Sequence, residues 1–190
     1  MAMPQVERIW SRDEVLALPN DGKRYELIDG QLLVSPSPRA VHQLALVALY
    51  DLVSIYVGHH RLGVTLLSPA DLDLGRGDLS QPDLYVVPEP DRPAELGWRG
   101  FAVPLLAVEI LSPSTARHDR ITKRRRYQQA GVGTYWIADV DAGAIEVWTP
   151  GAERPVVADR TVEWQPDRAL PPLVIDLERY FRPEWRSGAG

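Results

Sequence analysis

Apolar and polar positions follow two different periods along the chain, and each change of period marks an expected element. Between residues 40 and 56 the apolar positions recur at helical spacing, which predicts a long core helix. Shorter apolar runs bounded by turn residues predict strands. The expected strands are 25–28, 31–34, 64–67, 71–74, 82–87, 105–109, 135–138, 144–148 and 173–175, and the expected short helices are 12–18 and 176–181.

Turn and cap residues fix several of these boundaries. Ser11 followed by Glu14 has the pattern of a capping box, which predicts a helix start. The dipeptide Asp29-Gly30 stands between two strand segments and is a strong hairpin signal, so these two strands are expected to pair. Residues 88–100 are expected to form a surface loop, and residues 150–171 a turn-rich β region.

The centre of the chain, residues 105–139, alternates strand, loop, helix and strand. Its first apolar run ends on Glu109, and its helical segment carries Asp119, Lys123 and Tyr127 at intervals of four residues. Residues four apart lie on the same face of a helix, so these three side chains are expected to lie together.

Composition narrows the class of protein. The chain has 190 residues, of which 45% are apolar, so a single domain spanning residues 1–190 is expected. It has no cysteine, no pattern of a secretion signal and no apolar run of about 18 residues, so we expect a cytoplasmic protein with no membrane partner. The net charge of -5 argues against a general nucleic-acid coat protein, although a nuclease needs only a local basic groove.

A carboxylate within a buried strand points to chemistry. Glu109 would carry a desolvation cost there unless it pairs with a cation. Asp83 lies at the start of another predicted strand, so two adjacent strands could present both carboxylates at one edge of a sheet. Such hard oxygen donors suit Mg²⁺. The alternative is structural, since Asp83 follows Pro82 and could simply cap the strand end.

Several short motifs occur in a fixed order along the chain. They are Tyr25-Glu26-Leu27-Ile28-Asp29-Gly30, Ser35-Pro36-Ser37-Pro38 with His42, Pro82-Asp83, Glu109-Ile110-Leu111-Ser112-Pro113-Ser114-Thr115, Asp119, Lys123, Tyr127, Gly131-Val132 and Tyr135-Trp136. Their order and spacing resemble the Uma-two-type family of restriction endonucleases, a branch of the PD-(D/E)XK nuclease superfamily. The resemblance covers residues 10–182 and implies an α/β (α+β) restriction-endonuclease-like core, with a mixed central sheet flanked by helices and an N-terminal hairpin.

The resemblance also implies a metal site. Its cofactor would be Mg²⁺, with Mn²⁺ as a substitute, held by Asp83 and Glu109. The backbone carbonyl of Ile110 would be a third ligand, and Glu26 would join the site from the hairpin. For Glu26 the alternative is a solvated position on the hairpin.

The lysine of the superfamily pattern is absent from its usual place in this chain. Its shortest pattern has lysine two residues after the glutamate, where this chain has Leu111. The family resemblance points instead to Lys123 on the following helix, with Asp119 as its orienting partner. An ammonium group there could orient or deprotonate the attacking water. A solvated basic helix face is the alternative.

Four residues are candidates for contacts with nucleic acid: Arg124, Arg126, Tyr127 and His42. Neighbouring arginines on a helix point in successive directions, so only one or two of them could line a DNA groove. Tyr127 is expected either to pack or to donate to a phosphate, and a surface or capping role is the alternative for His42.

These features predict a Mg²⁺-dependent endonuclease that hydrolyses DNA phosphodiester bonds, with Asp83, Glu109, Glu26 and Lys123 as its catalytic residues. One alternative is an inactive nucleic-acid-binding module with the same fold, and another is a hydrolase of small phosphoesters. A homodimer would provide the two sites that cutting both strands of a duplex calls for, an expectation that rests on analogy.

Overall fold

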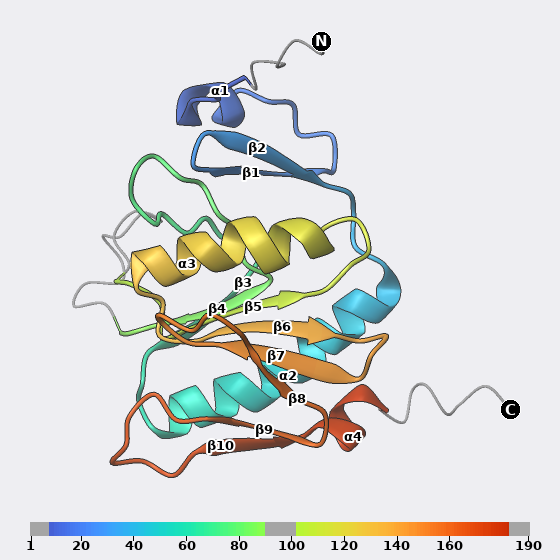
Figure 1. Ribbon diagram of the computed structural model, residues 1–190, viewed down its shortest axis with the longest axis vertical. Helices are drawn as coiled ribbons and strands as arrows, with labels where there is room; N and C mark the ends of the chain where they lie inside the picture. The colour runs from blue at the N-terminus through green and yellow to red at the C-terminus, as the bar shows by residue number, and fades with distance from the viewer. Residues whose placement is uncertain (1–7, 90–101, 183–190) are drawn as a thin grey trace, which may run out of the picture.

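A six-stranded mixed sheet forms the centre of the computed structural model, which describes residues 8–89 and 102–182 (Figure 1). Its strands are β3 (Val64–Leu67), β4 (Leu84–Val87), β5 (Leu106–Ile110), β6 (Tyr135–Asp139), β7 (Ala144–Trp148) and β8 (Val156–Ala158), hydrogen-bonded in that order. β5 and β6 pair in parallel, and the other neighbouring strands pair antiparallel. β4, β5 and most of β6 are buried, as their continuous apolar sequences require.

The parallel pair β5–β6 needs a crossover, and a helix provides it. The crossover begins as a π-helical segment, His118–Lys123, and continues as α3, Arg124–Ala130. Gly131 ends α3 in the left-handed conformation, with a φ of 81°, which glycine adopts without steric cost. The apolar side of this helix covers one face of the sheet through Tyr127, which packs with Tyr85 and Tyr135.

The long helix α2, Ala40–His59, covers the opposite face of the sheet (Figure 1). Its length and apolar composition would suffice to cross a membrane, but seven of its residues are buried within the protein. β9 (Thr161–Trp164) and β10 (Leu173–Asp176) form a separate two-stranded antiparallel sheet that packs with α2. The helix α4, Leu177–Phe181, follows β10.

The N-terminal hairpin is a separate two-stranded sheet of β1 (Arg24–Ile28) and β2 (Gln31–Ser35). Its strands pair around Asp29-Gly30, and the preceding helix α1, Arg12–Leu16, starts with the expected capping box. The hairpin joins the rest of the chain through paired backbone hydrogen bonds of 2.8 Å between Leu27 and Leu79. Glu26 is therefore held beside the loop that precedes β4.

The expected α/β (α+β) fold with a mixed central sheet is confirmed, and the differences are local. The strand expected at 71–74 is wrong, since only an isolated bridge between Leu72 and Ser80 forms there. α1 ends at Leu16 because turn residues follow it, and α2 extends to His59. The first part of the crossover helix is π-helical. Most of the loop expected at 88–100 lies outside the described residues.

Candidate active site

Asp83 and Glu109 lie at the same edge of the central sheet. β4 and β5 are antiparallel with Leu84 opposite Val108, so the next residues outward are Asp83 at the start of β4 and Glu109 near the end of β5. Both side chains are buried, with 2% and 1% of the residue exposed. Two buried carboxylates on neighbouring strands need nearby cations or hydrogen-bond donors.

Three donors surround the carboxylate of Asp83. Arg24 Nη1 donates to Oδ1 at 2.7 Å, and the backbone N–H of Ile110 donates to Oδ2 at 2.8 Å. Nε2 of His42 lies 3.1 Å from the same Oδ2. Burial alone would raise the pKa of Asp83, but the hydrogen bond from His42 and the charge of Arg24 hold it well below its usual value. Asp83 is therefore an ionised carboxylate.

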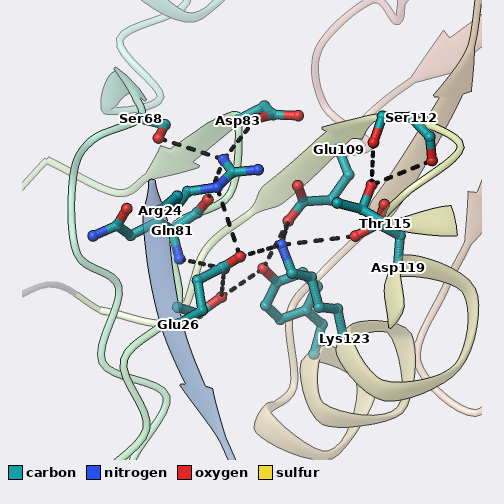
Figure 2. A network of polar contacts seen from close by, with 12 residues as sticks. Arg24, Glu26, Ser68, Gln81, Asp83, Glu109, Ser112, Thr115, Asp119 and Lys123 are labelled. Carbon is teal, nitrogen blue, oxygen red and sulfur yellow. Dashed lines mark hydrogen bonds and ion pairs between the residues drawn. The ribbon is translucent and has the colours of Figure 1, made fainter. Parts of the chain in front are cut away.

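The ammonium group of Lys123 lies among three other carboxylates (Figure 2). Its Nζ is 2.8 Å from Glu26, 2.9 Å from Glu109 and 3.7 Å from Asp119. Only 2% of the Lys123 side chain is exposed. Burial alone would lower the pKa of Lys123, but the charges of Glu109 and Glu26 raise it well above its usual value, so the amine stays protonated.

The carboxylates outnumber the permanent cations in this network. Four carboxylates face Arg24 and Lys123, and the four are Glu26, Asp83, Glu109 and Asp119. Burial, together with the neighbouring acids, raises the pKa of Glu109 well above its usual value and raises that of Asp119 as well. One ammonium group cannot neutralise three carboxylates, so protons bind more readily to Glu109 and Asp119 than in water.

Further hydrogen bonds hold the carboxylates of Glu26 and Glu109 in place. Tyr127 lies 2.7 Å from the hydroxyl of Ser80 and donates to Glu109 at 3.2 Å. The backbone N–H of Gln81 donates to Glu26 at 2.8 Å. Burial raises the pKa of Tyr127 well above its usual value, so its hydroxyl remains a donor. The network therefore fixes the orientation of both glutamates.

Tyr127→Phe is expected to lower the free energy of unfolding by about 2 kcal/mol, because a buried carboxylate and a serine hydroxyl lose a partner. Denaturation with urea, followed by circular dichroism, measures this change. Tyr50→Phe is the matched control, since Tyr50 is half-buried on α2 and its hydroxyl has no hydrogen bond within the described part of the chain. Its cost is expected to stay within about 0.5 kcal/mol. Equal costs for both variants would contradict a specific role of the Tyr127 hydroxyl.

A cleft of about 630 Å³ opens onto one side of this network. Its lining includes Arg24, His42, Asp83 and Ile110 on the inner side and residues 111–115 on one wall. Glu109 and Lys123 are buried and do not line the cleft. A ligand in the cleft would therefore meet Asp83 and Arg24 first.

The structure brings Glu26, Asp83, Glu109 and Lys123 into one network, as the sequence suggested for these four residues. The backbone of Ile110 belongs to it as well, but its described contact is the N–H on Asp83. Three members of the network, Arg24, Ser80 and Gln81, were missed. Arg24 was overlooked because its partner Asp83 lies in another sheet, and Gln81 because its contribution is a backbone N–H.

Of the four residues expected to contact nucleic acid, His42 lines the cleft and the other three do not. Arg126 is 3% exposed, and its guanidinium binds Asp78 and the carbonyl of Leu74, so it cannot line a groove. Arg124 lies over the ring of Trp148, 4.8 Å from its centroid, and outside the cleft.

Tyr127 is also corrected, whereas for His42 only the alternative of a surface or capping role is wrong and the contact with nucleic acid stays a prediction. Tyr127 is fully buried on Glu109, so it packs within the network and does not reach a phosphate. His42 is neither a helix cap nor a surface residue, because it is 8% exposed and contacts Asp83 from the first turn of α2.

Donor chemistry and charge decide whether a divalent ion suits this site. Within residues 8–89 and 102–182, no three His, Asp or Glu side chains are already arranged to hold a metal. Asp83 and Glu109 nevertheless supply hard oxygen donors at one sheet edge, and the four carboxylates, when all are ionised, carry two negative charges more than Arg24 and Lys123 balance. One divalent ion would balance that excess, so the residues fit such an ion by charge and donor type.

The mixed sheet brings an aspartate and a glutamate from adjacent strands to one edge, and a lysine from the following helix contacts the glutamate. The fold is that of a nuclease-like protein with a mixed central sheet. The family model Uma2, "Putative restriction endonuclease", matches residues 12–178, and the chain belongs to this family.

A solved structure shares the fold. It is described as a "putative nuclease belonging to DUF820" from Anabaena variabilis ATCC 29413, and it is 20% identical in sequence with a TM-score of 0.75. The match covers 90% of this chain and 97% of that one. The comparison with curated proteins gave no match.

Proposed function

We propose that this protein is an endonuclease that hydrolyses DNA phosphodiester bonds with Mg²⁺ as cofactor and Mn²⁺ as a substitute. The observation that carries the proposal is the meeting of Asp83 and Glu109 at one sheet edge, with Lys123 Nζ 2.9 Å from Glu109. The chain also belongs to a family whose description is "Putative restriction endonuclease", which supports the same class of reaction.

Asp83, Glu109 and the carbonyl of Ile110 would hold the ion in this proposal. When bound, a divalent ion lowers the pKa of its water and neutralises charge on the phosphoryl oxygens. Asp83 is suited to its part because it is ionised and its orientation is fixed by Arg24, His42 and the Ile110 N–H. A carboxylate with a fixed orientation loses little freedom when it binds a cation.

Lys123 and Glu26 would support this centre from behind. Lys123 donates to Glu109 and lies 2.8 Å from Glu26, so it fixes the position of Glu109 and brings a positive charge next to the reacting groups. That charge would orient the attacking water and stabilise the negative charge that develops on the phosphate. The carboxylate of Asp119 lies 3.7 Å from the same Lys123 Nζ and adds a third negative charge beside the amine.

Cleavage of plasmid or linear DNA by the purified protein is expected with Mg²⁺ or Mn²⁺ and is expected to stop in EDTA, because the attacking water then loses its activating ion. Calorimetric titration of the metal-free protein with Mn²⁺ should show binding that Glu109→Gln weakens by at least about tenfold, since one ligand charge is lost. Glu178→Gln is the control, because Glu178 lies on α4, outside the cleft.

Three results would contradict the proposal. Cleavage that continues in EDTA would exclude a metal-dependent reaction. DNA binding without Mn²⁺ binding or cleavage would instead identify an inactive nucleic-acid-binding module. Hydrolysis of small model diesters without salt-sensitive DNA affinity would favour a small-phosphoester hydrolase.

A further inference from the structure

The network contains two cations, Arg24 and Lys123, and they differ in their exposure to the cleft. The side chain of Lys123 is 2% exposed and lies outside the lining of the cleft. The side chain of Arg24 is 19% exposed and lines the cleft directly beside Asp83. An anionic group that enters the cleft therefore meets the guanidinium of Arg24 before it can approach the ammonium of Lys123.

Arg24 has hydrogen-bonding capacity to spare. Its Nη1 donates to Asp83 at 2.7 Å, to the carbonyl of Gln81 at 3.0 Å and to Ser68 at 3.5 Å. Its Nε lies 3.7 Å from Glu26. Within the described residues Nη2 has no partner, and Figure 2 shows one terminal nitrogen of Arg24 without a dashed line. A guanidinium group held by one nitrogen can offer the other to a phosphate oxygen.

Asp83 does not depend on Arg24 alone for its partners. His42 and the N–H of Ile110 both contact Oδ2, while Arg24 contacts Oδ1. The charge of Arg24 also cannot be lost by deprotonation, since burial alone would lower its pKa but Asp83 and Glu109 raise it further above its usual value. A permanent cation beside the proposed metal ligand and facing the cleft is placed for substrate binding.

We propose that Arg24 contacts the scissile phosphate of the nucleic acid through Nη2. This inference rests on the proposed function, because it takes the cleft as the entry for a phosphodiester. Arg24 would neutralise a phosphoryl oxygen and align the group with Asp83, while Lys123 serves Glu109 from behind. The phosphate contact is thereby assigned to Arg24 on β1, and not to the arginines of α3.

The rim of the same cleft has groups for the neighbouring phosphates. Lys23 and Arg39 line it, and both side chains are more than half exposed, at 52% and 58%. Ser37 and Ser114 add hydroxyl groups to the lining. A strand that crosses the cleft would therefore place one phosphate at Arg24 and the flanking phosphates near basic or hydroxyl side chains.

The test measures binding in EDTA, so that it does not depend on cleavage. Fluorescence anisotropy with a labelled single-stranded DNA is recorded over a range of KCl concentrations. Arg24→Gln is expected to weaken binding by about tenfold. It should also reduce the slope of log K against log salt by about 0.7, the loss of one phosphate contact on a single strand. Arg125→Gln, on the exposed side of α3 and outside the cleft, should leave both values unchanged.

Two further variants separate a direct contact from a general change of charge. Arg24→Lys keeps the charge but not the fork of donors, so it should keep the slope and weaken binding by a few-fold. In the double variant Arg24→Gln with Asp83→Asn, the charge of the pair is balanced again. The double variant and the unaltered protein then have the same net charge at this pair, so a direct contact predicts that the double variant binds at least about fivefold more weakly than the unaltered protein. An affinity equal to that of the unaltered protein would overturn the inference.

The outcomes distinguish this inference from the proposed nuclease activity. If Mg²⁺ supports cleavage while Arg24→Gln leaves the affinity and slope unchanged, only the role of Arg24 is overturned. If binding depends on Arg24 but no ion supports cleavage, the nuclease proposal fails and the phosphate site stands. Circular dichroism checks the fold of each variant. Should Arg24→Gln not fold, the affinity of Arg24→Lys decides, and an unchanged value overturns the inference.

Discussion

Asp83→Asn is expected to reduce metal-dependent DNA cleavage by at least about 100-fold while the protein stays folded. The substitution removes a charged ligand from the proposed ion site and keeps nearly the same shape. Its amide oxygen can still accept from Arg24 or from the N–H of Ile110. Because the network has more carboxylates than permanent cations, the loss of one negative charge also relieves repulsion of Glu109.

Single-turnover cleavage with Mg²⁺ measures the effect, and thermal unfolding in the same buffer checks the fold. Asp51→Asn is the matched control, because Asp51 is exposed on α2 and lies outside the cleft. The control should cut like the unaltered protein. Equal rates in Asp83→Asn and Asp51→Asn would remove Asp83 from the mechanism.

Lys123→Met is expected to lower the free energy of unfolding by about 3–5 kcal/mol and to abolish cleavage. The methionine has a similar length but leaves Glu26, Glu109 and Asp119 buried without their shared cation. Removing one partner of a buried ion pair costs far more than removing a surface pair, because the remaining charges cannot be solvated by water.

The chain provides its own control for this variant, because Lys23 is the only other lysine. Lys23 pairs with Asp21 on the surface, so Lys23→Met is expected to leave the free energy of unfolding nearly unchanged. Urea denaturation of both variants, with the slope checked for two-state behaviour, gives the comparison. Similar stabilities would show that Lys123 does not compensate the buried carboxylates.

Local sequence patterns predicted the elements that carry the site. Asp29-Gly30 defines the hairpin and its register, because only a tight turn fits between the two strands. Glu109 stood out because a carboxylate in a buried apolar run needs a partner. Spacing by four residues predicted that Lys123 and Tyr127 lie together, and both contact Glu109. These inferences used contacts within a segment or between neighbouring strands.

Other parts of the site depend on contacts that no local pattern encodes. Arg24 and Asp83 are 59 residues apart, and their contact follows from how the hairpin docks beside β4. Arg126 looked like a surface residue within a basic run, but it pairs with Asp78, which is 48 residues away. The π-helical segment His118–Lys123 was also unexpected, because a widened turn depends on what the helix packs against.

Residues of the site join the N-terminal hairpin to the central sheet. Glu26 belongs to the two-stranded sheet, whereas Glu109 belongs to the six-stranded sheet, and the amine of Lys123 bridges them. Besides the backbone pair of Leu27 and Leu79, this bridge fastens the two sheets together. A change that separates the hairpin from the six-stranded sheet would therefore also remove Glu26 from Lys123 and Glu109.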